Sequence, residues 1–197
     1  MQTYTHLIMT AAAYRGLKDT KTAVPSKAFL WGAVLPDLPL VLLTIGYFIF
    51  RRYDPLLSQE FIFGPTYDAL YFTNSWWIVG HNLLHAPPMG GLYALVGYLG
   101  QRRGYGWGRP LLWFAAGCGL HSFVDILTHV NDGPLLFFPF EWQTRFESPV
   151  SYWDPTYGGR VFTLFEHGLN LVLLGYLGLS WWTKNEKRET ENVKRET

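Results

Sequence analysis

Residues 119–132 read GLHSFVDILTHVND, an apolar segment in which ionisable side chains recur every four residues. These side chains are His121, Asp125 and His129. Residues four apart lie above one another on one face of an α-helix, so the spacing predicts a helix with a row of imidazole, carboxylate and imidazole. These groups are ordinary ligands of zinc and similar divalent ions. The alternative is a His–Asp ladder that is satisfied by its own hydrogen bonds and holds no ion.

This segment belongs to one of four long stretches that are nearly free of charge, namely residues 28–50, 69–101, 110–131 and 161–183. The charged residues inside them are Asp37, Asp125 and Glu166. Each stretch has about the 20 residues that a helix needs to cross a bilayer. Trp residues gather near their ends, as expected at a membrane interface. We therefore predict an all-α bundle of about four transmembrane helices with an N-terminal helix. A soluble domain with very apolar core helices is the alternative.

Composition agrees with a membrane protein. Among the 197 residues, 49% are hydrophobic and 16% are charged, whereas about 25% is the usual charged share. A net charge of +1 gives no strong field for binding nucleic acid. The single cysteine, Cys118, lies in an apolar run, which excludes a disulfide framework and predicts a buried thiol. The start of the chain lacks the basic region of a signal peptide, so insertion is expected to use internal segments.

The distribution of basic residues predicts the orientation of the four spans. Four Lys and Arg residues fall in the two loops on one side: Arg51, Arg52, Arg145 and Arg160. Twelve fall on the other side: Arg15, Lys18, Lys21, Lys27, Arg102, Arg103, Arg109, Lys184, Lys187, Arg188, Lys194 and Arg195. Because Lys and Arg accumulate in cytoplasmic loops, both termini are predicted to be cytoplasmic. We expect residues 1–183 to form one helical membrane domain and residues 184–197 a charged, partly disordered tail.

The second stretch carries two histidines at the same four-residue interval. His81 and His85 would share a face of their helix and could share an ion, although a pair of core histidines is about as common. Pro87 and Pro88 follow, and proline must kink or break that helix. The connection over residues 132–160 is long and rich in aromatic residues, which is typical of a functional loop.

The remaining ionisable residues are ambiguous when taken singly. Asp37 lies between apolar runs and needs a partner, but Asp is also a favoured N-cap residue. His6 alone is more typical of a structural histidine. Glu166 and His167 open the last stretch, where Glu166 could favour the helix dipole or act as a general base near a metal.

Several short motifs follow one another in order: Thr5-His6, Leu35-Pro36-Asp37, His81 to His85, and His121-xxx-Asp125 followed by Gly133-Pro-Leu-Leu-xx-Pro139-Phe140. The set resembles the bacterial membrane-bound metal-dependent hydrolases, often called YdjM-like, over roughly residues 3–183. It is more distantly similar to zinc-dependent phospholipase C, an all-helical phosphodiesterase. The His-xxx-Asp helix with its downstream Gly and Pro-Phe pattern is the most specific part.

The resemblance implies a phospholipase C-like cluster of His and Asp ligands around one or more zinc-like ions. The implied metal ligands are His6, Asp37, His81, His85, His121, Asp125, His129 and His167. His129 and His167 match least closely. In phospholipase C the last ligand helix carries His and Glu one turn apart, whereas here Glu166 and His167 are adjacent and position 171 is Leu171.

These features predict a metal-dependent hydrolase in a bacterial inner membrane, or another energised membrane, with a phosphoester or lipid-type substrate. Bound metal would activate water, and Asp37 or Glu166 would be the catalytic carboxylate. The alternatives are a membrane scaffold with a structural metal site, or a metal or proton pathway. Expected partners are membrane lipid and a small-molecule or lipid substrate. His6 precedes the first span and Asp37 falls within it, so they meet the other ligands only if the N-terminal segment dips into the bundle or the topology differs.

Overall fold

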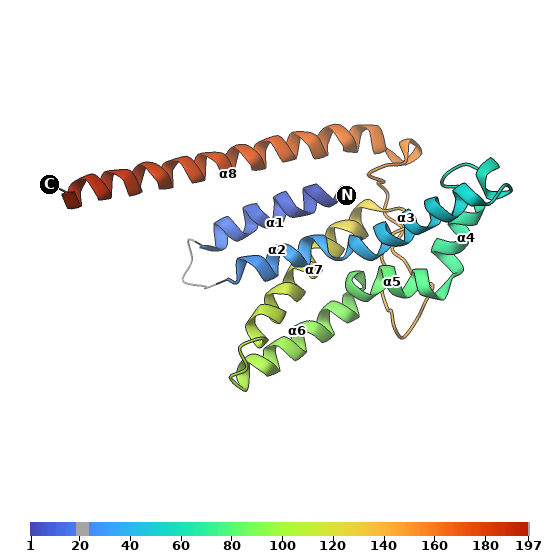
Figure 1. Cartoon of the computed structure of the whole chain (residues 1–197), viewed down its shortest axis with the longest axis horizontal. Helices are drawn as coiled ribbons and strands as arrows, with labels where there is room; N and C mark the ends of the chain where they lie inside the picture. The colour runs from blue at the N-terminus through green and yellow to red at the C-terminus, as the bar shows by residue number, and fades with distance from the viewer. Residues whose placement is uncertain (19–23, 197) are drawn as a thin grey trace.

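Residues 1–18 and 24–196 are described in a computed structural model, and this part of the chain folds entirely as helices and loops (Figure 1). Its α-helices are α1 (Thr3–Lys18), α2 (Ser26–Val34), α3 (Asp37–Tyr53), α4 (Pro65–Thr73), α5 (Ser75–His85), α6 (Pro87–Arg102), α7 (Gly108–Thr128) and α8 (Gly159–Glu196). Two short 3₁₀ helices, Leu57–Gln59 and Pro155–Tyr157, lie in the loops. The all-helical prediction is confirmed. Lys21 lies outside the described residues.

Three helical segments of the described chain are long and apolar enough to cross a membrane: Ser26–Tyr53, Gly108–Thr128 and Gly159–Glu186. The first joins α2 and α3 across Leu35 and Pro36. These segments support the predicted membrane helices, while the fourth span stays a prediction.

The stretch predicted as the fourth span is divided into α4, α5 and α6. Asn74 ends α4 and caps α5, because its side chain accepts hydrogen bonds from the amides of Trp76 and Trp77. Ala86 has an extended backbone with ψ of 132°, as expected for a residue before proline. Pro87 then starts α6, where its missing N–H costs no helical hydrogen bond. The predicted break at the prolines is therefore present.

α7 is the central helix of the bundle, and glycines bring α2 against it. A Cβ added to Gly32 of α2 would lie 2.2 Å from the carbonyl oxygen of Phe114, and one added to Gly117 would lie 2.3 Å from that of Phe29. Only the absence of side chains at these positions permits this approach. As a result, the end of α2 and the start of α3 are held beside the His-xxx-Asp face of α7.

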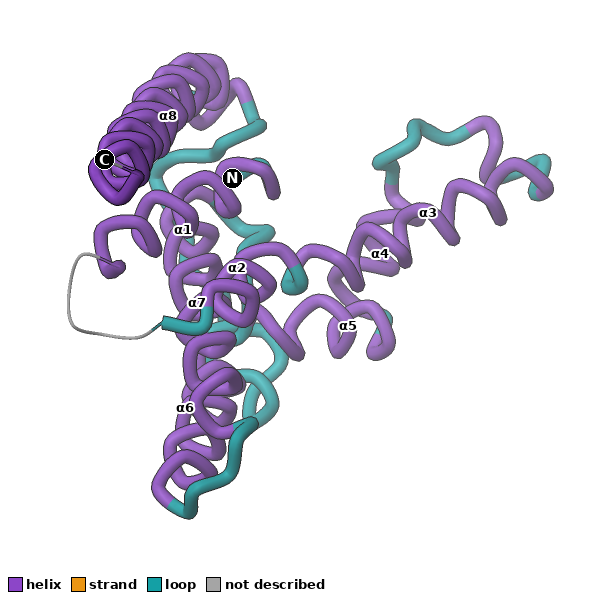
Figure 2. Tube along the Cα trace, turned by 60° about the vertical axis from the view of Figure 1, so that its left-hand side comes forward, coloured by secondary structure: helices purple, strands orange, loops and turns teal. Residues whose placement is uncertain are grey.

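The N-terminal helix α1 lies between α2 and α8 and packs against both (Figure 1). In contrast, α4 and the far ends of α3 and α5 extend away from α7 and α8 (Figure 2). Aromatic rings join these three helices. The ring of Tyr67 makes edge-to-face contacts with the rings of Tyr47 and Trp77, with 5.5 Å and 5.3 Å between ring centroids. Because α1 packs against both α2 and α8, the N-terminal segment does enter the bundle.

The long loop after α7 is tied to the bundle on two sides. Asn82 of α5 accepts a hydrogen bond from the amide of Leu135 at 2.7 Å, and Leu135 is fully buried. Leu135 and Phe138 pack with Ile78 and Met89 in the main apolar cluster. On the other side, the amide of Tyr152 donates to the carbonyl of Thr128. The loop thus covers the end of α7 that carries the ionisable residues.

The helical backbone of α8 continues through Lys184 to Glu196, where the sequence predicts a partly disordered tail. The side chains of Lys187, Arg188, Lys194 and Arg195 lie outside the described part of the structure. The division into a domain and a tail stays a prediction.

Candidate metal centre

Four ionisable residues from three helices meet at the centre of the bundle: Asp37, His85, His121 and Asp125. Asp37 is the first residue of α3, His85 is the last residue of α5, and the other two belong to α7. One ligand atom from each lies within 4.8 Å of all the others. Three of the four residues are buried, and Asp37 is partly exposed. This group could bind a metal ion.

His121 lies at the middle of this group. Its Nε2 atom is 2.9 Å from Nε2 of His85, 3.1 Å from Oδ2 of Asp125 and 3.3 Å from Oδ1 of Asp37. Asp37 therefore contributes its carboxylate to the cluster. It does not cap its helix, because α3 begins at Asp37 itself and its N-cap residue is Pro36. The hydroxyl of Thr3 donates a hydrogen bond to the second oxygen of the Asp37 carboxylate.

The outer ring nitrogens show which atoms face the centre. Nδ1 of His85 lies 2.8 Å from the carbonyl oxygen of His81, and Nδ1 of His121 lies 2.8 Å from that of Ala33. A carbonyl only accepts hydrogen bonds, so each Nδ1 carries the proton and each Nε2 of a neutral ring presents a lone pair. Metal-bound histidines show this arrangement. Two lone pairs 2.9 Å apart repel unless a cation or a proton lies between them, and the donor set therefore fits a divalent metal.

His6 of α1 also lies at the cluster, so the N-terminal segment reaches the ligand group through this helix. Its Nε2 atom lies 3.0 Å from Oδ1 of Asp125, and its ring stacks on His121 with 3.8 Å between centroids. His6 is 2% exposed, and its Nε2 makes no hydrogen bond of good geometry. Burial lowers the pKa of His6 despite the opposing effect of Asp125. A neutral imidazole with a free buried nitrogen is suited to ligation.

Asp125 also holds the start of the chain. The α-amino group of Met1 lies 2.8 Å from Oδ1 of Asp125 and 3.2 Å from the hydroxyl of Thr128. Positive or imidazole groups therefore surround this carboxylate from α1, α5 and α7. Such pairing is what a buried charge requires.

Of the other predicted ligands, His81 and His129 lie beside the four-residue group, whereas His167 contacts Tyr4 at the surface. Nδ1 of His81 is 3.2 Å from the hydroxyl of Tyr71, and the His81 ring is 4.5 Å from that of His85. Nδ1 of His129 is 2.9 Å from the backbone carbonyl of Asp125 and 3.8 Å from its Oδ1. His167 is exposed and lies 3.3 Å from the hydroxyl of Tyr4. Their roles as ligands stay predictions.

Glu166 contacts α1 and lies outside the four-residue group. It is 1% exposed, and its Oε1 accepts a hydrogen bond from the amide of Gln2 at 2.9 Å. One turn later, Asn170 donates from Nδ2 to the hydroxyl of Thr5 at 2.8 Å. Amides at a helix start lack partners within the helix. Glu166 therefore supplies a hydrogen-bond acceptor for such an amide and positions the helix that carries His6.

Replacing Glu166 tests this positioning contact against direct metal ligation. Glu166→Ala is expected to lower the melting temperature and weaken zinc binding, because α1 loses a buried acceptor worth about 1–3 kcal/mol. Glu166→Gln keeps an acceptor oxygen and should retain most of both properties. Thermal unfolding and zinc titration in detergent measure the two effects. If both variants lost zinc equally, Glu166 itself would bind the metal through its carboxylate.

Sequence reasoning missed the residues that support the cluster. Thr3 and Thr128 contact Asp37 and the amino group of Met1, respectively, but a threonine carries no distinctive signal. Asn82 gave a better one, because a polar amide lies between two histidines in an apolar helix. It is fully buried and holds the long loop through Leu135.

Comparison with known proteins identifies a family for this arrangement. The sequence profile described as YdjM inner membrane protein matches residues 1–189. Neither the curated proteins nor the solved structures give a significant match. The profile covers all eight α-helices up to the last turns of α8, including every residue of the metal-binding group. The chain therefore belongs to the YdjM inner membrane protein family.

Proposed function

We propose that the protein is a membrane-embedded metal-dependent hydrolase that acts on a phosphoester or lipid-type substrate. The observation that carries this proposal is the pair of Nε2 lone pairs, from His85 and His121, facing two carboxylates. Nitrogen and oxygen donors of this kind suit zinc. When bound, such an ion supplies Lewis acidity and lowers the pKa of a coordinated water. The ligands from separate helices support the likeness to phospholipase C.

Asp37 is the best placed of the two predicted catalytic carboxylates. Its side chain is 20% exposed, whereas that of Asp125 is 6% exposed, so substrate and water reach the cluster from the side of Asp37. A catalytic metal site keeps such an open position, and a structural one is closed by protein. Asp37 can accept a proton from a water molecule at this opening. Glu166 is held by the Gln2 amide and acts on the site through α1.

The test is hydrolysis by the full-length, zinc-loaded protein in detergent or vesicles. Bis-p-nitrophenyl phosphate and phosphatidylglycerol vesicles serve as probes. We expect zinc-dependent release of product, and Asp37→Asn should lower it at least about a hundredfold, the lower range for loss of proton transfer. Asp68→Asn, an exposed acidic residue of α4, is the matched control and should keep wild-type activity. Bound zinc without turnover on either probe would favour the structural-site alternative.

We further propose four spans with both termini in the cytoplasm of a bacterial inner membrane, supported by the excess of basic residues near the termini. The loop between α3 and α4 then lies on the opposite side, where Phe61 is 88% exposed. Phe61→Cys, made with Cys118→Ser, should react with an impermeant maleimide added to intact cells. If Phe61→Cys reacted only after the membrane was permeabilised, the loop would lie in the cytoplasm and the orientation would be the opposite one.

A further inference from the structure

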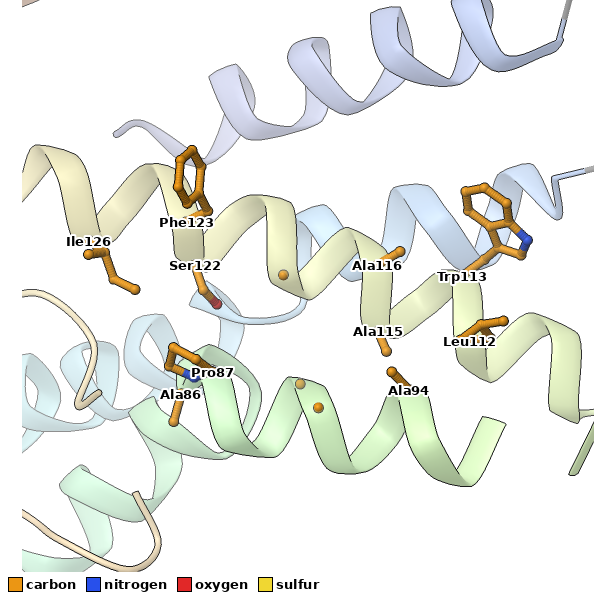
Figure 3. A pocket seen from close by; sticks show the side chains of 13 residues that line it. Ala86, Pro87, Ala94, Leu112, Trp113, Ala115, Ala116, Ser122, Phe123 and Ile126 are labelled. Atoms are coloured by element: carbon orange, nitrogen blue, oxygen red, sulfur yellow. The ribbon is translucent and has the colours of Figure 1, made fainter. Parts of the chain in front are cut away.

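α6 and α7 enclose an apolar groove of about 610 Å³ on the bundle (Figure 3). Sites for small molecules usually measure about 300–1,000 Å³. Small residues create the hollow: Ala86 just before α6, Gly90 and Gly91 on α6, and Ala115, Ala116 and Gly119 on α7.

The groove exists because the two helices diverge along their length. A Cβ added to Gly97 would lie 2.6 Å from the amide nitrogen of Leu112, so the helices touch there. A Cβ added to Gly90, Gly91 or Gly119 would meet nothing within 4 Å. The space between the helices therefore opens from Gly97 towards the start of α6.

The lining is suited to a hydrocarbon chain. Its polar groups are the indole N–H of Trp113 and the hydroxyl of Ser122, which already donates to the carbonyl of Cys118 at 2.8 Å. No side chain of the lining is charged. A hydrocarbon chain from the bilayer therefore keeps an apolar environment in the groove and gains van der Waals packing. Trp113, Phe123 and Ile126 also line it, and these bulky side chains would keep the backbone of another helix at a distance.

One end of the groove is lined by residues that follow two members of the metal-binding group in sequence. Ala86 directly follows His85, and Ser122 directly follows His121. Figure 3 shows Pro87 facing Ser122 across this end, with Ala86 next to Pro87. The same two helices expose Leu92, Leu95 and Phe123, the apolar surface that a membrane protein presents to bilayer lipid. A chain that enters the groove from the bilayer would therefore end at Ala86 and Ser122, the residues that follow the two histidines in sequence.

We propose that this groove binds one acyl chain of a bilayer lipid and places the headgroup end of that lipid near Ala86 and Ser122, which follow His85 and His121 in sequence. That the lipid is also the substrate rests on the proposed function, whereas binding of the chain does not.

Photolabelling tests the proposal on the full-length protein in vesicles of phosphatidylethanolamine and phosphatidylglycerol. The probe is a phosphatidylethanolamine with a diazirine in one acyl chain. We expect the label to concentrate on peptides of α6 and α7. Gly90→Leu and Gly119→Leu should reduce it several-fold, because the new side chains fill space that is open in the wild type. Leucine is also the better helix former, so both variants should fold.

Gly175→Leu is the matched control, since Gly175 lies in the membrane-spanning part of α8 with nothing within 4 Å of an added Cβ. It should leave the labelling unchanged. Equal labelling of α3, α8 and the groove helices would overturn the proposal by showing ordinary boundary lipid. The proposal would also be overturned if chemical crosslinking joined α6 of one copy to α7 of another and the lipid probe did not label the groove. Labelling at the groove in a protein that hydrolyses neither probe would sustain it while the proposed function fails.

Discussion

Asp125→Asn is expected to remove bound metal and to destabilise the protein more than a change at any exposed carboxylate. The carboxylate lies 2.8 Å from the Met1 amino group, 3.0 Å from His6 and 3.1 Å from His121. Breaking a buried charge pair by removing one partner costs about 3–5 kcal/mol. The amide has nearly the same shape, so the loss reports charge and ligation. Zinc content and thermal unfolding in detergent measure the two effects.

The control for this change is Asp68→Asn, which alters the same functional group at an exposed position of α4. It should leave zinc content and melting temperature within error of the wild type. An Asp125→Asn protein as stable as the wild type and still loaded with zinc would contradict the assignment of Asp125 to the centre.

Gly32→Ala is expected to have the second large effect, although it lies outside the ligand group. The new methyl group would lie 2.2 Å from the carbonyl oxygen of Phe114 and 2.9 Å from the amide nitrogen of Cys118. Both are backbone atoms, so α2 and α7 must separate. Overpacking costs about 1–3 kcal/mol. Separation also removes the Ala33 carbonyl from Nδ1 of His121 and moves Asp37. We therefore expect a lower melting temperature and weaker zinc binding together.

Gly119→Ala is the control, because it is the same substitution at a glycine of α7 that does not contact α2. Gly119 lies two residues after Gly117 on α7, but an added Cβ there meets nothing within 4 Å. This variant should be as stable as the wild type. If Gly32→Ala matched it in both measurements, the close approach of α2 and α7 would not position the centre.

The sequence predicts the helical membrane architecture because charge-free stretches and aromatic ends are local properties. It also predicts His121 and Asp125, because a four-residue interval fixes a shared helical face before any tertiary contact is known. These are the parts of the fold and site that depend on spacing and composition alone. The isolation of Asp37 among apolar residues predicts only that it needs a partner, and its role as a ligand is implied by the family resemblance.

The remaining parts depend on tertiary packing. His81 and His85 have equivalent spacing, and only the orientation of α5 places His85 in the group and His81 against Tyr71. Similarly, His6 reaches Asp125 because α1 packs between α2 and α8. The contact of Glu166 with Gln2 joins residues 164 apart in sequence, which no local pattern reveals. The division of the second stretch at Asn74 likewise needed the structure.

The most direct test of the central claim is the metal content of wild-type protein purified in detergent, with X-ray absorption at the zinc edge to identify the ligands. We predict about one or more equivalents of metal, with imidazole nitrogen and carboxylate oxygen ligands at about 2.0–2.2 Å. Absence of bound metal, even after reconstitution with zinc or manganese, would contradict the account. His85, His121 and Asp125 would then form a proton-sharing structural cluster.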